Sequence, residues 1–315
     1  MKLKLAEYSV TNFRAIKGTK MVVLRTKYED GPVNLIIDSE SGSGKTSFVD
    51  FFYLFRGIRH KGFRTGNLMN VYADPNKEFV SFKLAFLNPE NEKVEYALML
   101  QESGGILSES LTHGMKTIFS TNSITGITKF DGFDADSIKP THNTPMLDAL
   151  KDMHDTINSV CTYIMNVGTC NSHNALSASY PEACDDMNFV LKRYGIDIKE
   201  FENFLRDPVG IDDPIVDMLV FENLDLGEVL SNEQLMCKVI FDYFVCPNNP
   251  TQLVIFDHLD GMLDPYDYRF NNVLRWVRER SDKDIIMIYN NGITYHYPDY
   301  SFPEDIGNTI VMHME

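Results

Sequence analysis

The chain has 315 residues, of which 43% are hydrophobic and 23% are charged. These proportions exclude a disordered chain, and no apolar run approaches the ~20 residues that a membrane-spanning helix needs. With 45 acidic against 29 basic residues, the net charge is −16. This charge does not support unaided nucleic-acid binding, although it leaves room for a local basic face.

The first residues and the cysteines bear on where the protein works. Met1–Glu7 contains no long apolar core, so we expect no secretory leader. The cysteines form no CxxC pair, which is simplest in a reduced compartment. They are Cys161, Cys170, Cys184, Cys237 and Cys246. We therefore expect a cytoplasmic protein without a membrane partner.

The N-terminal part is predicted to consist mainly of β-strands. Its strands are marked by alternating apolar and polar residues or by short apolar runs. They are residues 3–13, Met21–Leu24, Asn34–Asp38, Phe79–Leu87 and Val94–Leu100. The last two strands flank the turn Asn88–Asn91 and are predicted to form a hairpin.

The rest of the chain combines helices and strands. The predicted helices are Met146–Ile157, Met187–Arg193, Leu235–Phe244 and Tyr266–Arg280. The predicted strands are Gln252–Asp257, Asp284–Tyr289 and Asn308–Met314. Alternating strands and helices favour a largely parallel sheet, so the fold class is α/β, with an added antiparallel part from the N-terminal hairpins. We expect an N-terminal lobe over residues 1–130, a helical lobe over 131–247 and a C-terminal lobe over 248–315, together forming one head.

A glycine-rich segment, Ser39–Thr46, lies between the strand Asn34–Asp38 and an apolar helix that begins near Lys45. It matches the pattern G-x-x-x-x-G-K-[ST], except that Ser39 replaces the first glycine. In this pattern, backbone N–H groups and a helix N-terminus surround phosphate oxygens, the lysine reaches the β and γ phosphates, and the hydroxyl holds Mg²⁺. Ser39 would have to adopt the opening turn without the freedom of glycine. The candidate phosphate-binding residues are Ser39, Gly42, Ser43, Gly44, Lys45, Thr46 and Ser47.

Together with this loop, two other segments resemble ABC-type ATPases of the SMC-like, RecF-like and overcoming-lysogenization-defect group. They are Val10–Arg14 near the start and Val94–Leu111, which looks like the hairpin that follows the loop in that group. The resemblance implies a P-loop NTPase fold of the ABC/SMC-like head type, with ATP and Mg²⁺ as cofactors. It also implies that Arg14 lies near the nucleotide, although a salt-bridged strand end is an equal alternative.

The later motifs of that group occur in altered form. Leu253–Asp257 resembles a Walker B strand, so the resemblance implies that Asp257 and Thr46 hold Mg²⁺. The next residue in the family is a glutamate that positions the attacking water, and here it is His258. Leu263–Pro265 stands where the family has its D-loop.

Two more positions differ from the family. Leu230–Gln234 resembles the ABC signature, in which Ser231 would face the nucleotide of a partner head, but Glu233 stands at a glycine position. An ordinary helix cap is the alternative for this segment. Asn291 stands where the family has a switch histidine, and an amide cannot carry the proton. The candidate catalytic residues are Asp257, His258 and Asn291.

The resemblance implies a subunit that binds ATP and Mg²⁺ but hydrolyses ATP slowly or not at all. It would form a homodimer or higher oligomer and act as a nucleotide-gated scaffold for an effector such as a nuclease, in antiphage defence or DNA repair. One alternative is an active ATPase whose carboxylate comes from Glu40, Asp260 or a partner subunit. Another is an interaction module that no longer binds nucleotide. The basic segment Arg56–Arg64 is interpreted as a solvated loop after the first helix rather than as a contact for a phosphate backbone.

Overall fold

The computed structural model describes two compact units. The first comprises Met1–Gly31, Ser39–Val167 and Met312–Glu315, and the second comprises Pro32–Asp38 and Gly168–Val311. The described residues are 1–29, 31–40, 42–61, 68–73, 78–102, 104–123, 125, 127–131, 144–171, 250–257, 282–289 and 308–314. The predicted α/β class is confirmed, with one parallel and one antiparallel arrangement of strands. None of the helices in these ranges is long and apolar enough to cross a membrane.

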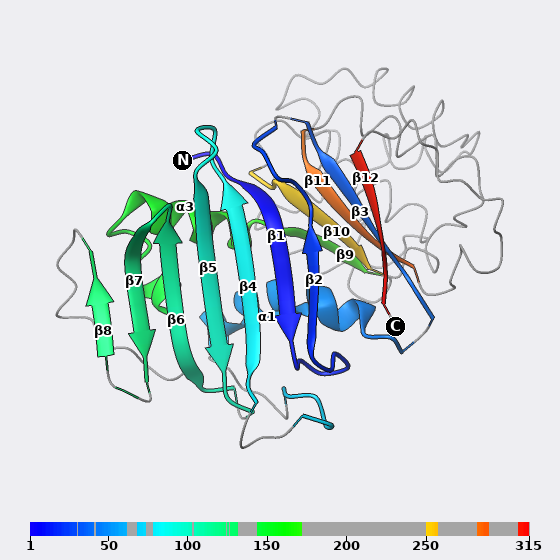
Figure 1. The fold of residues 1–315 in the computed structure, drawn as a ribbon, viewed down its shortest axis with the longest axis horizontal. Coiled ribbons are helices and arrows are strands. Elements are labelled where there is room, and N and C mark those ends of the chain that lie inside the picture. The colour runs from blue at the N-terminus through cyan, green and yellow to red at the C-terminus, as the bar shows by residue number, and fades with distance from the viewer. Residues whose placement is uncertain are drawn as a thin grey trace, which may run out of the picture. The chain divides into compact units, whose positions relative to one another are not determined.

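A seven-stranded antiparallel sheet dominates the first unit (Figure 1). Its strand order is β2-β1-β4-β5-β6-β7-β8. The strands are β1 (Lys4–Thr11), β2 (Thr19–Val23), β4 (Val80–Leu87), β5 (Lys93–Leu100), β6 (Ile106–His113), β7 (Lys116–Asn122) and β8 (Ile127–Phe130). The predicted hairpin is confirmed as β4–β5, and the hairpin-like segment after it as β5–β6. Strands β7 and β8 had no prediction.

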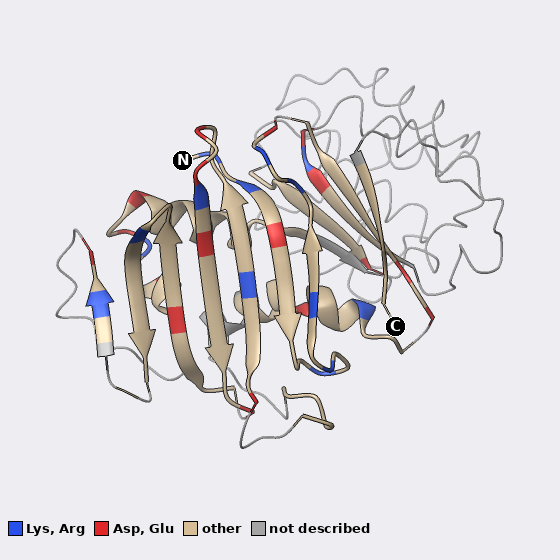
Figure 2. Cartoon of the chain, viewed as in Figure 1, with Lys and Arg blue, Asp and Glu red and all other residues tan. Residues whose placement is uncertain are grey.

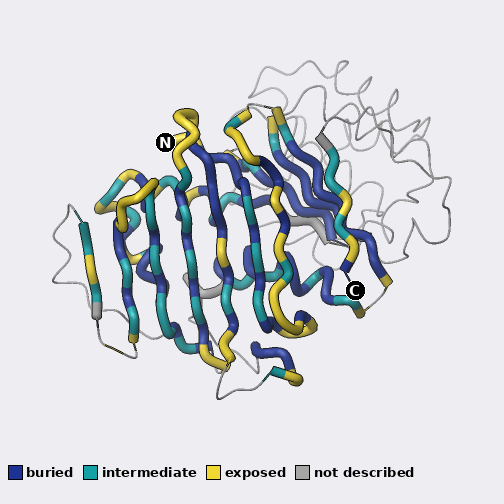
Figure 3. The backbone as a smooth tube through the Cα atoms, in the orientation of Figure 1, coloured by how far each residue is buried: buried dark blue, intermediate teal, exposed yellow. Residues whose placement is uncertain are grey.

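Helices cover one face of this sheet (Figure 1). They are α1 (Lys45–Lys61), α2 (Met146–Ala149) and α3 (Asp155–Met165). Aromatic rings join the layers: Tyr8 of β1 contacts Phe48 of α1 with 4.9 Å between ring centroids, and Phe86 of β4 contacts Tyr163 of α3 at 5.0 Å. Burial alternates along β5, as it must when only one face of a strand is covered (Figure 3).

Charged residues of both signs lie along the strands of this sheet (Figure 2). Lys83 and Lys93 lie 2.8 and 3.0 Å from the carboxylate of Glu95, and Lys93 also lies 3.2 Å from Glu7. Lys83 of β4 pairs with Glu95 of the neighbouring strand β5, whereas Lys93 pairs with Glu95 of its own strand and with Glu7 of β1. Because these lysines are paired with carboxylates, this described part of the sheet is not a basic surface that would suit a phosphate backbone.

A five-stranded sheet has the order β12-β3-β11-β10-β9. Its strands are β3 (Val33–Asp38), β9 (Gly168–Asn171), β10 (Leu253–Asp257), β11 (Asp284–Tyr289) and β12 (Asn308–His313). The pairs β3–β11, β11–β10 and β10–β9 are parallel, which confirms the predicted parallel sheet. Strands β3 and β10 are buried along their whole length, as is usual in parallel sheets (Figure 3).

Two predictions about helices are wrong. The single helix Met146–Ile157 is two helices, because the chain takes an extended conformation at His154, whose Nδ1 accepts the N–H of Thr156 and caps α3. Of the segment predicted as a loop after the first helix, Arg56–Arg64, residues 56–61 belong to α1, and residues 62–64 lie outside the described residues. The other predicted helices, Met187–Arg193, Leu235–Phe244 and Tyr266–Arg280, lie outside the described residues.

Candidate phosphate-binding site

The glycine-rich loop follows β3 directly and contains two glycines in the left-handed region. Gly42 has φ +87° and Gly44 has φ +93°, values that are costly for any residue with a Cβ. At Gly42 an added Cβ would meet no atom within 4 Å. At Gly44 it would lie 3.3 Å from Cγ1 of Ile16 and 3.4 Å from Cβ of Ala15. A Cβ at Gly44 would therefore be strained by the positive φ, and the segment that packs against it would have to shift by a few tenths of an ångström.

Lys45 turns its side chain back into the loop. The residue is only 3% exposed, and its Nζ donates to the carbonyl oxygens of Ser39 at 2.6 Å and Glu40 at 2.5 Å. A third, longer contact of 3.4 Å joins Nζ to the hydroxyl of Ser43. These bonds hold a positive charge inside the curve of the loop.

Lys45 is also the first residue of α1. The N–H of Phe48 donates to the carbonyl of Gly44 at 2.9 Å, so the helical hydrogen bonds begin within the loop. The first turn of α1 contains no acidic residue. No acidic residue in the first turn therefore offsets the partial positive charge of the helix N-terminus, and Thr46 stands half-buried at this end. These features suit a phosphate group with a coordinated Mg²⁺.

Ser39, at the first glycine position, is not in the left-handed region, so the strain expected from replacing glycine is absent. Its hydroxyl instead accepts the backbone N–H of Met314 at 2.6 Å. Ser39 and Met314 are each 3% exposed. Ser39 thus joins the start of the loop to the residue that follows β12.

Arg14 lies beside the loop in a tight turn after β1. Its neighbours Ala15 and Ile16 are the residues that meet Gly44, and its guanidinium forms an ion pair with Asp50 of α1. Asp50 is four residues after Thr46, hence one helical turn along the same face of α1. The salt-bridged alternative for Arg14 is therefore observed, and a contact with nucleotide stays a prediction.

Asp257 ends β10 and is buried. The sheet registers pair Phe256 with Met287, and Met287 with Ile36. Asp257 is therefore level with Ile37, one residue before the end of β3, on the carboxyl edge of a parallel sheet, the edge at which ligands bind in open α/β folds. Ser39 and the glycine-rich loop follow that end of β3 in the chain.

Several predicted site residues lie outside the described residues. They are Ser231, Glu233, His258, Asp260 and Asn291. In the described ranges, no group of three or more His, Cys, Asp or Glu side chains is arranged to hold a metal ion.

No protein-family model matches the chain, and no curated protein matches it. Among solved structures, the chain is similar to the SMC head domain from Thermotoga maritima, with 12% identity, a TM-score of 0.46, and coverage of 93% of this chain and 91% of that chain. It is also similar to an Smc head domain with an extended coiled coil bound to the C-terminal domain of ScpA, derived from Pyrococcus furiosus, with 9% identity, a TM-score of 0.47, and coverage of 100% and 94%.

A third similar structure is that of the recombination mediator protein RecF with ATP, in the RecFOR pathway. Its identity is 12%, its TM-score 0.42, and coverage is 92% of each chain. These structures belong to the SMC-like and RecF-like group that the sequence motifs resemble. The likeness concerns the fold alone.

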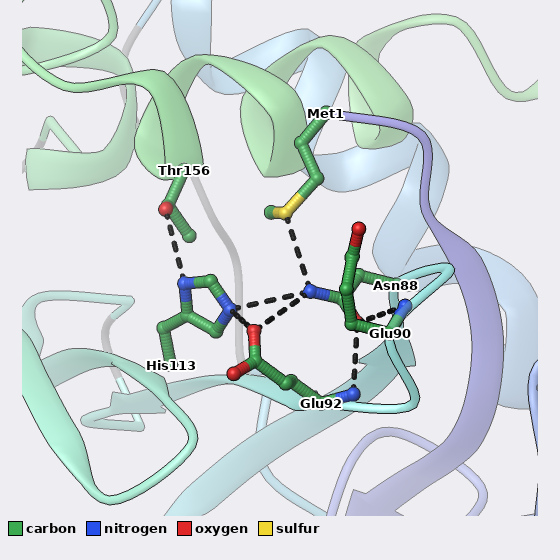
Figure 4. Close-up of polar contacts among 6 residues, drawn as sticks. All are labelled: Met1, Asn88, Glu90, Glu92, His113 and Thr156. Atoms are coloured by element: carbon green, nitrogen blue, oxygen red, sulfur yellow. Dashed lines mark hydrogen bonds and ion pairs between the residues drawn. The ribbon is translucent and has the colours of Figure 1, made fainter.

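A second polar cluster joins the β4–β5 turn to β6 and α3 (Figure 4). His113 Nε2 lies 2.9 Å from a carboxylate oxygen of Glu92, and Asn88 donates to the same oxygen at 3.0 Å. The Asn88 hydrogen bond, and secondarily that of His113, lower the pKa of Glu92 from its usual value. Nδ1 of His113 lies 3.5 Å from the hydroxyl of Thr156, which is itself buried. The cluster connects the β4–β5 turn, β6 and α3 through hydrogen bonds.

A buried carboxylate, which the sequence pattern did not reveal, connects the sheet to α2. Glu109 of β6 accepts the hydroxyl of Tyr96 at 2.9 Å and the backbone N–H groups of Met146 and Leu147 at 2.6 and 2.9 Å. Burial raises the pKa of Glu109 to about 7, although these three hydrogen bonds oppose the rise. The sequence also gave no sign of Asp50 and Met314 as the partners of Arg14 and Ser39.

Proposed function

We propose that the protein binds ATP with Mg²⁺ through the glycine-rich loop and hydrolyses it slowly or not at all. The observation that carries the proposal is the loop itself: two left-handed glycines, a buried Lys45 turned inward, and a helix N-terminus without an acid in its first turn. A triphosphate supplies the negative charge that this arrangement would attract.

The roles of individual residues follow the loop pattern and the family resemblance. The backbone N–H groups of the loop, with Ser43 and Ser47, would bind phosphate oxygens, and Lys45 would exchange its carbonyl partners for the β and γ phosphates. Thr46 and Asp257 would hold Mg²⁺, which would offset the charge of the phosphates. The position of Asp257 at the end of β10 supports its part in this proposal.

Slow hydrolysis is proposed because the residue after Asp257 is His258 instead of a carboxylate, and Asn291 replaces a histidine. A missing general base costs on the order of 10²–10⁴ in rate. We propose that the resulting long-lived ATP state serves as a switch. Two heads would join across ATP, with Ser231 facing the partner's nucleotide, and this state would control an effector such as a nuclease in antiphage defence or DNA repair.

The test is to incubate the purified chain with α-labelled ATP and Mg²⁺, remove free nucleotide, and separate the bound label into ATP and ADP over several hours. Wild-type protein is expected to retain label as ATP, and Lys45→Ala is expected to retain none. Lys27→Ala is the matched control, because Lys27 is an exposed lysine of the same unit outside the loop.

Three outcomes separate the readings. Bound ATP that persists supports the switch. Bound label that becomes ADP shows an active ATPase whose carboxylate lies elsewhere, for example at Glu40 or Asp260. Equal, negligible binding by wild type and Lys45→Ala would leave an interaction module. Turnover by His258→Glu would separate the first two readings further, because a restored carboxylate speeds hydrolysis only where that group is the missing one.

A further inference from the structure

A short turn in the first unit presents an aromatic ring to solvent. Val71 and Tyr72 are each 77% exposed, at the tip of the turn formed by Asn70–Ala73. The N–H of Tyr72 donates to the side chain of Asn70 at 3.0 Å, and the N–H of Ala73 donates to the Asn70 carbonyl at 2.9 Å. An exposed tyrosine is common, but here its backbone is held by two hydrogen bonds.

The turn is anchored to the segment that follows β1. Asn70 is buried, its N–H donates to the carbonyl of Asn12 at 2.8 Å, and its side-chain amide donates to the carbonyl of Arg14 at 2.7 Å. The N–H of Arg14 in turn donates to the carbonyl of Leu68 at 2.8 Å. Four hydrogen-bonded residues therefore fix where the Tyr72 backbone stands.

The anchoring segment is itself under backbone strain. Asn12 has φ +52° and Arg14 has φ +49°, so two residues with a Cβ within three positions are left-handed. The side chain of Asn12 accepts the N–H of Gly18 at 2.8 Å and closes the segment into a loop. Strain of this kind persists where the surrounding structure holds it, and it concentrates at ligand sites.

The same segment touches the phosphate loop. Ala15 and Ile16 are the residues that an added Cβ at Gly44 would crowd, at 3.4 and 3.3 Å. Lys17 follows Ala15 by two residues, so their Cα atoms are at most about 7 Å apart. The Nζ atom of Lys17 lies 5.9 Å from the centroid of the Tyr72 ring. One segment thus contacts both the loop that suits a phosphate and, through Lys17, an exposed aromatic ring.

We propose that Tyr72 is the stacking platform for the base of the nucleotide whose phosphates the loop binds. The inference rests on the proposed function and adds the base-binding part of the site. Lys17 places a positive charge beside the ring, which would attract a negatively charged nucleotide. Because every base has a π face, stacking on one ring gives affinity without strong base preference. The ligand class is therefore a nucleoside triphosphate in which ATP and GTP gain similarly from Tyr72.

The test compares a ligand that has a base with one that lacks it, on the full chain. Dissociation constants are measured calorimetrically for ATP–Mg²⁺, GTP–Mg²⁺ and inorganic tripolyphosphate–Mg²⁺. Tyr72→Ala is expected to weaken ATP and GTP about tenfold, the usual value of one stacked base, and to leave tripolyphosphate unchanged. Tyr72→Phe should keep the wild-type affinities, because it keeps the ring. Val71→Ala, at the neighbouring position with the same exposure, is the matched control and should change nothing.

The outcomes separate this inference from the proposed function. If Lys45→Ala abolishes binding of all three ligands but Tyr72→Ala leaves ATP and GTP within twofold of wild type, the loop binds triphosphate and the stacking role is wrong. An equal loss for tripolyphosphate would make Tyr72 a support for the loop, which also overturns the inference. If wild-type protein binds none of the three, the proposed function and the stacking role fail together.

Discussion

The bond between Ser39 and Met314 gives the sharpest prediction about stability. Both residues are almost fully buried, and the hydroxyl accepts the Met314 N–H at 2.6 Å. Ser39→Ala leaves that N–H buried without its partner, which costs about 1–3 kcal/mol. We therefore expect the free energy of unfolding of the ligand-free protein to fall by about 2 kcal/mol.

Ser43→Ala is the matched control in the same loop. The Ser43 hydroxyl receives only a 3.4 Å contact from Lys45 and is half-buried, so its loss should cost about 0.5 kcal/mol or less. Ser39→Gly restores the residue usual in this motif, yet it should be less stable than Ser39→Ala by about 0.5–1 kcal/mol. It loses the same hydrogen bond and adds backbone freedom to the unfolded chain.

Urea unfolding followed by far-ultraviolet circular dichroism measures all three variants. Equal stabilities of Ser39→Ala and Ser43→Ala would refute the stabilising role of the hydroxyl. If Ser39→Gly proved more stable than Ser39→Ala, the backbone at this position would be strained after all.

Three further predictions concern the loop and its surroundings. Gly44→Ala should be less stable in urea than Gly42→Ala by about 1–2 kcal/mol, because a positive φ strains both variants but only the Cβ at Gly44 would crowd a neighbour, Ile16 at 3.3 Å. Glu109 binds its proton more tightly in the folded protein, with a pKa of about 7 against 4.5. The free energy of unfolding should therefore fall by about 3 kcal/mol as pH rises from about 4.5 to about 7, and then level off. In urea unfolding measured across this pH range, Glu109→Gln should remove this slope. Arg14→Ala should weaken ATP–Mg²⁺ binding about tenfold, while the loss of its half-exposed pair with Asp50 should cost about 1 kcal/mol of stability or less.

Each of these has a clear contrary result. Equal losses for the two glycine variants would show that Ile16 yields to the added methyl group. A pH slope that persists in Glu109→Gln would assign the titration to another group. Unchanged ATP affinity in Arg14→Ala would make the arginine purely a partner of Asp50.

Local patterns in the sequence predicted much of the fold. The alternation in Val94–Leu100 indicates a strand with one buried face, and β5 has that burial pattern. The continuous apolar run Leu35–Ile37 indicates a strand buried on both faces, as β3 is. Strands β7 and β8 were not predicted, because Ser, Thr and Lys occupy many of their positions and weaken the apolar pattern. Pairing with β6 makes β7 a strand. The break between α2 and α3 at His154 was also not predicted, because histidine is not a typical N-cap residue.

For the candidate site, too, some features were predicted from the sequence and others were found only in the structure. The sequence by itself determined the loop, since the order of strand, glycines, lysine and helix is a local property of about fifteen residues. The tertiary structure alone decided what surrounds it. Met314 is 275 positions from Ser39, Asp50 holds Arg14, and the Asn70 turn carries Tyr72 to the segment that touches Gly44. These contacts join residues far apart in the chain, and neither periodicity nor spacing can encode which distant backbone group will meet a given side chain once the sheets have formed.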